Sequence, residues 1–274
     1  MDRCPDAPQP LAGRTIGVTR AEQQAGEARR LFEAAGARVV DLPALVITPP
    51  DDWGPLDDAL AELEQFHWIV FSSTNGVEAV EQRLARRGGS LARRPRGVRL
   101  AAVGRKTAAL LDELAAAADF VPPSFVADSL IEHFPVSGWG LRLLLPRVQS
   151  GGRTVLADAF AEAGARIVEV AAYESRCPEA LPSGALLALE RRQLDAITFS
   201  SAKTVSHTGQ LLQRSFGERW REQLSGSRII SIGPQTSGRC RSLLGRMDAE
   251  ADPHDLNGLV AACVQALRGP ATQI

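Results

Sequence analysis

Three pairs of short segments carry hydroxyl side chains, glycines and cations, which are groups that bind anions well at the start of a helix. The pairs are Val18–Arg20 with Pro146–Arg147, Phe71–Asn75 with Phe199–Thr204, and Val103–Thr107 with Ile232–Ser237. The chain has only two lysines, Lys106 and Lys203, and both lie in these segments. Serine, threonine and asparagine are also ordinary helix-capping residues, so one such segment alone indicates no site. Two matched sets favour an anion-binding site.

The paired segments belong to an internal repeat in which short motifs recur in the same order. The recurring positions are Arg20 and Arg147, Ala35–Arg38 and Ala163–Arg166, Phe71–Ser73 and Phe199–Ser201, Gly104/Thr107 and Gly233/Thr236, and Asp128/Leu130 and Asn257/Leu259. The offsets lie between 127 and 129 residues. Chance could produce one match in a chain rich in alanine and arginine, but not five in order. The sequence therefore predicts two similar halves.

Strands and helices alternate through both halves, so we expect a parallel sheet with helices on both faces. The expected strands are Arg14–Thr19, Arg38–Leu42, His67–Phe71, Val98–Val103, a short one near Phe120, Leu141–Leu145, Arg166–Ala171, Ala196–Phe199 and Ile229–Ile232. The expected helices are Glu22–Ala35, Leu56–Gln65, Asn75–Arg86, Lys106–Ala117, Ala127–Phe134, Thr154–Ala163, Leu186–Arg192, Lys203–Gln213, Thr236–Leu244 and Leu256–Leu267. Right-handed crossovers make each half a doubly wound, flavodoxin-like α/β structure. Ligands bind such sheets beyond the carboxyl ends of the strands, where the paired segments lie.

Composition and motifs exclude several classes of function. The chain has 274 residues with a formal charge of −1, which gives no electrostatic case for binding nucleic acid. It contains no GxGxxG, GxxxxGK[ST] or GxSxG motif, which disfavours cofactor-dependent redox chemistry and phosphoryl transfer. The four cysteines and four histidines match no metal-binding spacing, so we expect reduced thiols and no metal.

The first ten residues and the hydropathy of the chain predict the location of the protein. Residues 1–10 lack the apolar segment of a signal peptide and are expected to form a disordered tail. No apolar run is long enough to span a membrane, so we expect a cytoplasmic protein without membrane contact.

The single tyrosine, Tyr173, follows the expected strand Arg166–Ala171. A phenol at this place either fills space at a strand end or donates a hydrogen bond to a ligand.

These motifs together resemble the uroporphyrinogen-III synthase family. The resemblance rests on Phe71–Val77, Val103–Thr107, Tyr173–Ser175, Ile197–Val205, Ile232–Ser237 and Asp255–Val260, which span almost the whole chain. It implies two flavodoxin-like domains joined by a two-stranded linker, with a cleft between them. One domain is then 11–44 plus 172–274 and the other 45–171, with Tyr173 facing the cleft. The family uses neither a cofactor nor a metal.

The resemblance also implies a reaction and a set of binding residues. The family closes linear hydroxymethylbilane into uroporphyrinogen III, with loss of water and inversion of the last ring through a spirocyclic intermediate, as a step of heme-type tetrapyrrole biosynthesis. Tyr173 is then the acid that assists departure of the hydroxyl. The residues expected to bind the substrate carboxylates are Arg20, Ser72, Ser73, Thr107, Arg147, Ser200, Ser201, Lys203, Gly233 and Thr236. A monomer is expected. A two-lobed protein that binds or senses a small anion without catalysis is the alternative, because the same architecture serves both.

Overall fold

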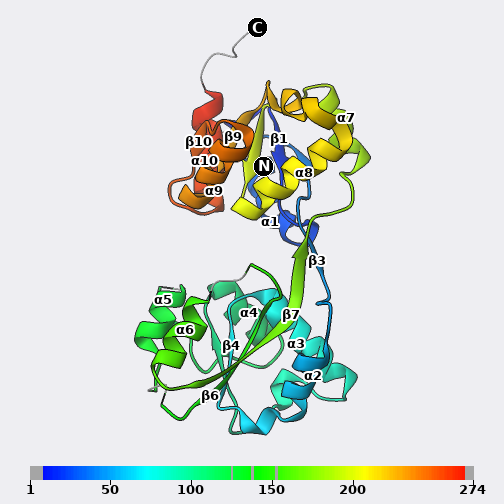
Figure 1. Cartoon of the computed structure of the whole chain (residues 1–274). Helices are drawn as coiled ribbons and strands as arrows, with labels where there is room; N and C mark the ends of the chain where they lie inside the picture. The colour runs from blue at the N-terminus through cyan, green and yellow to red at the C-terminus, as the bar shows by residue number, and fades with distance from the viewer. Residues whose placement is uncertain (1–8, 125, 137–138, 152–153, 269–274) are drawn as a thin grey trace, which may run out of the picture. The chain divides into compact units, whose positions relative to one another are not determined.

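The computed structural model in Figure 1 describes residues 9–124, 126–136, 139–151 and 154–268. Residues 1–8 of the expected tail, with Cys4, lie outside these ranges. The strands are β1 (Thr15–Val18), β2 (Arg38–Asp41), β3 (Val46–Thr48), β4 (Trp68–Phe71), β5 (Arg99–Ala102), β6 (Arg142–Val148), β7 (Arg166–Arg176), β8 (Ala196–Phe199), β9 (Arg228–Ser231) and β10 (Ala249–Glu250).

The helices follow the strands in alternation. They are α1 (Glu22–Ala34), α2 (Gly54–Ala61), α3 (Thr74–Arg86), α4 (Arg105–Glu113), α5 (Ala127–His133), α6 (Val155–Glu162), α7 (Ser183–Glu190), α8 (Ala202–Phe216), α9 (Pro234–Leu244) and α10 (Leu256–Leu267). Short 3-10 helices lie at Leu63–Gln65, Leu91–Arg93 and Gly217–Leu224. The α/β class is confirmed.

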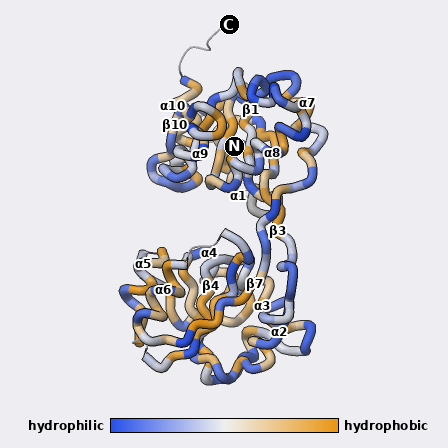
Figure 2. Tube along the Cα trace, in the orientation of Figure 1, coloured by the Kyte–Doolittle hydropathy of each residue, from blue (hydrophilic) through white to orange (hydrophobic). Residues whose placement is uncertain are grey.

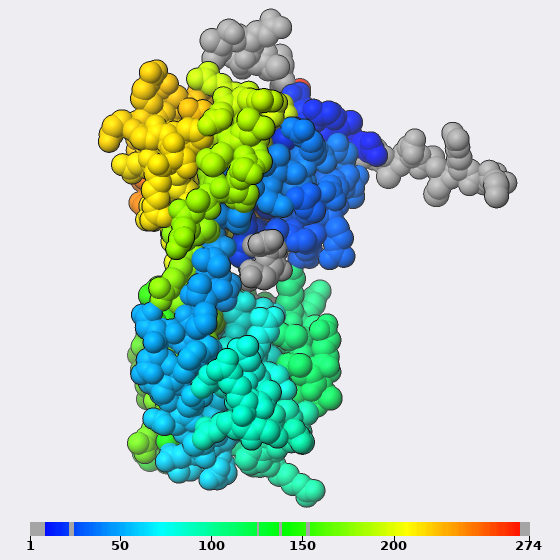
Figure 3. Space-filling model, turned by 90° about the vertical axis from the view of Figure 1, so that its right-hand side faces the viewer, coloured from blue at the N-terminus to red at the C-terminus, as the bar shows by residue number. Residues whose placement is uncertain are grey.

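The chain divides into two compact units, and the backbone passes from one unit to the other at two points in the sequence. Unit 1 is Met1–Val46 with Arg176–Ile274, and unit 2 is Ile47–Ser175. The sheet of unit 1 has the order β10-β9-β8-β1-β2, and that of unit 2 has the order β3-β7-β6-β4-β5. Within unit 1, Figure 3 shows the blue N-terminal residues packed beside the yellow-green segment that follows residue 176.

The internal repeat appears in the structure as identical strand registers. Ile16 of β1 pairs with Ala196 of β8, and the equivalent Leu143 of β6 pairs with Trp68 of β4. The remaining equivalent pairings also match. They are Thr15 with Arg38 against Arg142 with Arg166, and Ala196 with Arg228 against Trp68 with Arg99. The four strands β2-β1-β8-β9 thus repeat as β7-β6-β4-β5, all in parallel pairs.

One expectation from the repeat is wrong. The repeat alone predicted one sheet for each half of the sequence, but each sheet takes strands from both halves. β1 and β2 pair with β8 and β9, while β4 and β5 pair with β6 and β7. Because equivalent strands present the same pattern, the repeat fixes the register but not which copy supplies the partner.

Each sheet has a hydrophobic core on both of its faces. In unit 1, Ile16, Ala196 and Ile230 pack under α1 and α10, while Ile197 and Phe199 pack under α7, α8 and α9. Unit 2 repeats this, with Trp68 and Leu143 facing α5 and α6, and Ile69 and Leu144 facing α2, α3 and α4. Figure 2 shows hydrophobic residues along the central strands such as β4 and β6. The sheets are therefore doubly wound, as expected from the alternation.

Candidate functional site

Two serines start equivalent helices at the carboxyl ends of β4 and β8. Ser73 is the N-cap of α3, and its Oγ accepts a hydrogen bond from the Gly76 N–H at 3.2 Å. Ser201 is the N-cap of α8, and its Oγ accepts from the Thr204 N–H at 3.2 Å. Serine is favoured at this position because its oxygen satisfies a helix N–H that has no partner within the helix. Capping therefore explains both serines locally.

Tyr173 lies within β7, which continues to Arg176 rather than ending at Ala171 as the sequence suggested. Its backbone is fixed in the sheet, because Tyr173 pairs with Val148 and its carbonyl accepts from the Gln149 N–H at 2.8 Å. The phenol lies at the start of α3, where Ser73 Oγ donates a hydrogen bond to Tyr173 Oη at 3.0 Å. This contact joins the predicted catalytic residue to a predicted binding residue.

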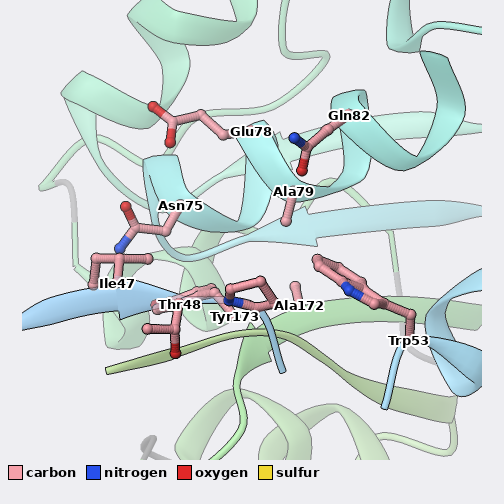
Figure 4. Close-up of a pocket in the computed structure, with 10 residues that line it drawn as sticks. Ile47, Thr48, Trp53, Asn75, Glu78, Ala79, Gln82, Ala172 and Tyr173 are labelled. Carbon is pink, nitrogen blue, oxygen red and sulfur yellow. The ribbon is translucent and has the colours of Figure 1, made fainter. Parts of the chain in front are cut away.

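A cavity of about 390 Å³ lies beside this contact, entirely within unit 2. In Figure 4, Asn75, Glu78 and Gln82 of α3 line one side of the cavity, and Tyr173 and Thr48 of β7 and β3 line the other. The complete lining is Ile47, Thr48, Pro49, Trp53, Asn75, Glu78, Ala79, Gln82, Ala172 and Tyr173. Its walls combine amides, hydroxyls and one carboxylate with aromatic rings.

Trp53 closes the far end of the cavity and is itself held by a cation. The Arg83 guanidinium lies 4.8 Å from the centre of the Trp53 ring, and Arg83 Nε donates to Asp57 at 2.8 Å. Arg83 holds the pKa of the Asp57 carboxyl below its ordinary value through this hydrogen bond. The ion pair holds the guanidinium in place, where it stacks against the indole of Trp53.

The predicted cations of the two units differ in their surroundings. Arg147 on β6 forms an ion pair with Glu169 on β7. Its repeat partner Arg20 follows β1 and is half-buried, and burial lowers the pKa of its guanidinium, partly offset by Glu27. Lys203, in the first turn of α8, is also half-buried.

The predicted threonines and glycine occupy equivalent first turns of α4 and α9. Thr107 and Thr236 are each 4% exposed. Gly233 is the N-cap of α9 and, with a φ of 171°, has an extended backbone. Of the predicted serines, Ser72 is exposed and Ser200 is half-buried.

Strand order determines which predicted residues come together. In unit 1, the turns after β1, β8 and β9 share one edge because these strands are parallel neighbours. This edge gathers Arg20, Ser200, Ser201, Lys203, Gly233 and Thr236. In unit 2, neighbouring strands gather Ser72, Ser73, Thr107, Arg147 and Tyr173 in the same way. Each unit therefore presents its own set.

Tyr173 and the segment ending at Asn75 were singled out from the sequence, but the other residues that line the cavity were missed. Asn75, Glu78 and Gln82 share one face of α3, and their i, i+3, i+7 spacing was a readable signal for a polar stripe beside Tyr173. Trp53 carried no such signal. His254 was also passed over, although its ring lies 3.4 Å from where a Cβ on Gly233 would be, and its Nε2 lies 3.4 Å from Glu250 Oε1.

Among the described residues, no group of three or more histidine, cysteine, aspartate or glutamate side chains could hold a metal ion. Within the same ranges, no helix combines the length and hydropathy that crossing a membrane requires.

Comparison with known proteins decides the family. The sequence model of the family described as "Uroporphyrinogen-III synthase HemD" matches residues 26–261. The chain belongs to the uroporphyrinogen-III synthase family. It is 47% identical over 262 residues to the uroporphyrinogen-III synthase of Synechococcus elongatus, covering 96% of this chain and 98% of that protein.

Solved structures from the same family share the fold. The uroporphyrinogen III synthase of Thermus thermophilus, as a mutant, matches with a TM-score of 0.59 and 20% identity, covering 93% of this chain and 99% of that one. The enzyme of Helicobacter pylori matches with a TM-score of 0.58 and 16% identity, covering 92% and 99%. The family predicted from the sequence is confirmed, and with it an enzyme of porphyrin biosynthesis. The non-catalytic anion-binding alternative is not favoured.

Proposed function

We propose that this chain converts hydroxymethylbilane into uroporphyrinogen III, mainly by holding the linear tetrapyrrole in one conformation. The observation that carries the proposal is the 47% identity, over almost the whole length, to a uroporphyrinogen-III synthase. The pyrrole nitrogen itself expels the hydroxyl and leaves a cationic azafulvene, the azafulvenium. The substituted carbon of the terminal ring then attacks, and the spirocyclic product fragments and recloses with that ring inverted. The protein's main task is therefore positioning.

Tyr173 assists the first step as an acid. Its phenol lines the cavity of unit 2, and its backbone is held by the pairing of β6 with β7. Proton transfer to the departing hydroxyl converts a poor leaving group into water. General acid assistance of this kind contributes on the order of 10²–10⁴-fold to the rate.

The substrate carboxylates bind at the carboxyl edges of the two sheets. Ser72, Ser200 and Ser201 offer hydroxyls, and Arg20, Arg147 and Lys203 offer positive charge. Thr107 and Thr236, each 4% exposed, contribute their hydroxyls. The backbone N–H groups of the same first turns, which follow Gly104 and Gly233, bind beside them. Helix N-termini favour such anions because their first N–H groups have no partners within the helix. A monomeric state and a cytoplasmic location stay predictions.

A coupled assay tests the proposal. Hydroxymethylbilane is generated in place, and the uroporphyrin isomers are separated after oxidation. Without catalysis the linear tetrapyrrole closes to isomer I, so the proposal predicts mostly isomer III at substoichiometric protein. Isomer I alone, from protein whose circular dichroism shows it to be folded, would contradict the proposal and leave the cavity as a binding site.

A further inference from the structure

The Ser73 hydroxyl accepts one hydrogen bond and donates another. The Gly76 N–H donates to Ser73 Oγ at 3.2 Å, and Ser73 Oγ donates to Tyr173 Oη at 3.0 Å. A serine hydroxyl has one proton to donate, and Ser73 donates it in the hydrogen bond to the Tyr173 oxygen. The phenol's own proton is therefore not used in this contact and remains available to a ligand.

We propose that Ser73 is a positioning residue that holds Tyr173 for proton donation, which rests on the proposed function. The register of β7 fixes the Tyr173 backbone, and Ser73 then fixes the phenol oxygen at the start of α3. In this arrangement Ser73 acts through Tyr173. Its single proton is committed to the phenol, so it has none left for a substrate carboxylate.

The repeat within the chain separates this role from helix capping. Ser201 caps α8 with the same 3.2 Å hydrogen bond that Ser73 makes in α3. The residue equivalent to Tyr173 at an offset of 128 is Leu45, whose side chain has no group that could accept a hydrogen bond from Ser201. Helix capping explains why both repeat positions carry a serine. The hydrogen bond from Ser73 to a phenol is an additional feature of unit 2.

The proposed step conserves protons and electrons. The Tyr173 proton moves to the substrate hydroxyl oxygen, the C–O bond breaks with its electron pair going to that oxygen, and water leaves. The pyrrole nitrogen supplies the electrons that form the azafulvenium. The phenoxide that remains accepts the Ser73 hydrogen bond and faces the positive end of α3. The proton lost from the terminal ring on closure restores the phenol.

The protein's single tyrosine gives a direct spectroscopic test. Protein grown with [ζ-¹³C]tyrosine has one tyrosine resonance, and that resonance reports the surroundings of the Tyr173 oxygen without substrate. Ser73→Gly removes the hydroxyl, and glycine remains an acceptable N-cap, so α3 is retained. The resonance is expected to move in Ser73→Gly, to return toward its wild-type position in Ser73→Thr, and to stay in place in the matched cap variant Ser201→Gly. An unmoved resonance in Ser73→Gly would overturn the proposal.

A double-mutant cycle then tests whether Ser73 acts through Tyr173. In single-turnover assays, Ser73→Gly is expected to slow the reaction by about tenfold or more, as misplaced catalytic groups do, and Ser73→Thr to recover most of the rate. In a Tyr173→Phe background, Ser73→Gly is expected to change the rate by less than about twofold. An equal loss in both backgrounds would place Ser73 on the substrate and overturn the proposal. The resonance is read without substrate, so loss of the synthase activity itself would show separately in the wild-type assay.

Discussion

Ser73 and Ser201 lie at equivalent positions of the repeat, and each caps its helix with the same hydrogen bond, but only Ser73 also contacts a tyrosine. The two units thus share the framework of a site, namely parallel strands that end in small, polar turns. They differ in that unit 2 carries Tyr173, the phenol proposed to donate a proton. The proposed acid therefore belongs to unit 2.

Replacing Tyr173 by phenylalanine removes the acid and leaves the ring in place. We expect kcat to fall by about 10²–10⁴-fold, because a proton donor is lost without a change in packing. Steady-state turnover at saturating hydroxymethylbilane measures this. A variant that turns over at the wild-type rate would show that the phenol takes no part in the step.

Replacing Glu169 by glutamine releases Arg147 from its ion pair. If Arg147 binds a substrate carboxylate, product affinity should rise on the order of fivefold, the scale of one partly exposed charge pair. The gain should shrink as salt is added. Glu33→Gln makes the same change in net charge, at a surface ion pair on α1, and is the control. Equal affinity in Glu169→Gln and Glu33→Gln would exclude Arg147 from binding.

Replacing both Thr107 and Thr236 by alanine tests the binding of carboxylates at the first turns of α4 and α9. Product binding is expected to weaken on the order of tenfold for each hydrogen bond lost to a charged group. The matched double variant with serine keeps both hydroxyls and should bind as the wild type does. Titration calorimetry with product makes the comparison, and unchanged binding in the alanine variant rejects this role for the two threonines.

Gly258 lies against backbone that has no room for a side chain. A Cβ at this position would be 1.9 Å from the Pro253 carbonyl oxygen, whereas one on Gly238 of α9 would meet nothing within 4 Å. Gly258→Ala should therefore lower the free energy of unfolding by about 2 kcal/mol or more. Gly238→Ala should raise it by up to about 1 kcal/mol, because alanine is the better helix former. Urea denaturation of the two variants checks this, and equal midpoints would contradict it.

His207 makes stability depend on pH. Its Nδ1 lies 2.7 Å from the Ala44 carbonyl oxygen, so it carries the proton of a neutral ring. Burial lowers the pKa of the ring below its ordinary value of 6.5. The hydrogen bond to Ala44 partly offsets this effect, and the nearby charges of Lys203 and Arg214 add to the lowering. Well above pH 6.5 the ring is neutral in both the folded and the unfolded state. As the pH falls through this value the unfolded chain takes up a proton first, so the free energy of unfolding falls.

Replacing His207 by glutamine should flatten this dependence, because glutamine does not titrate. The comparison is urea unfolding of wild type and variant between pH 8 and pH 5. The variant is expected to be the less stable protein at pH 8, since the hydrogen bond to Ala44 is disturbed, and to lose less stability on acidification. Parallel curves would show that His207 is not the group responsible.

The sequence allowed most elements to be predicted, because buried parallel strands and capped helices leave strong local signals. Ala196–Phe199 matches β8 at both ends. The short strands β3 and β10 were not predicted, because two or three half-buried residues leave no periodicity. The full length of β7 was hidden by the polar residues Glu174 and Ser175 near its end.

The exchange of strands between halves could not be predicted from the repeat, since β1 satisfies the same register beside either copy of its neighbour. The contact between Ser73 and Tyr173 was hidden for a related reason. The two residues are 100 positions apart and meet only because β7 and β4 both border β6. Local pattern predicted the serine as a cap and the tyrosine at a strand end, but not their hydrogen bond.

In the proposed mechanism, the protein determines the product by positioning the substrate, while Tyr173 contributes only to the rate. The most direct test is a single-turnover reaction with enzyme in excess over hydroxymethylbilane, comparing wild type with Tyr173→Phe for both rate and product isomer. We predict a slower reaction that still gives isomer III, because the bound conformation is intact. Isomer I from fully bound substrate in the variant would contradict the claim, since the phenol would then also decide which carbon attacks.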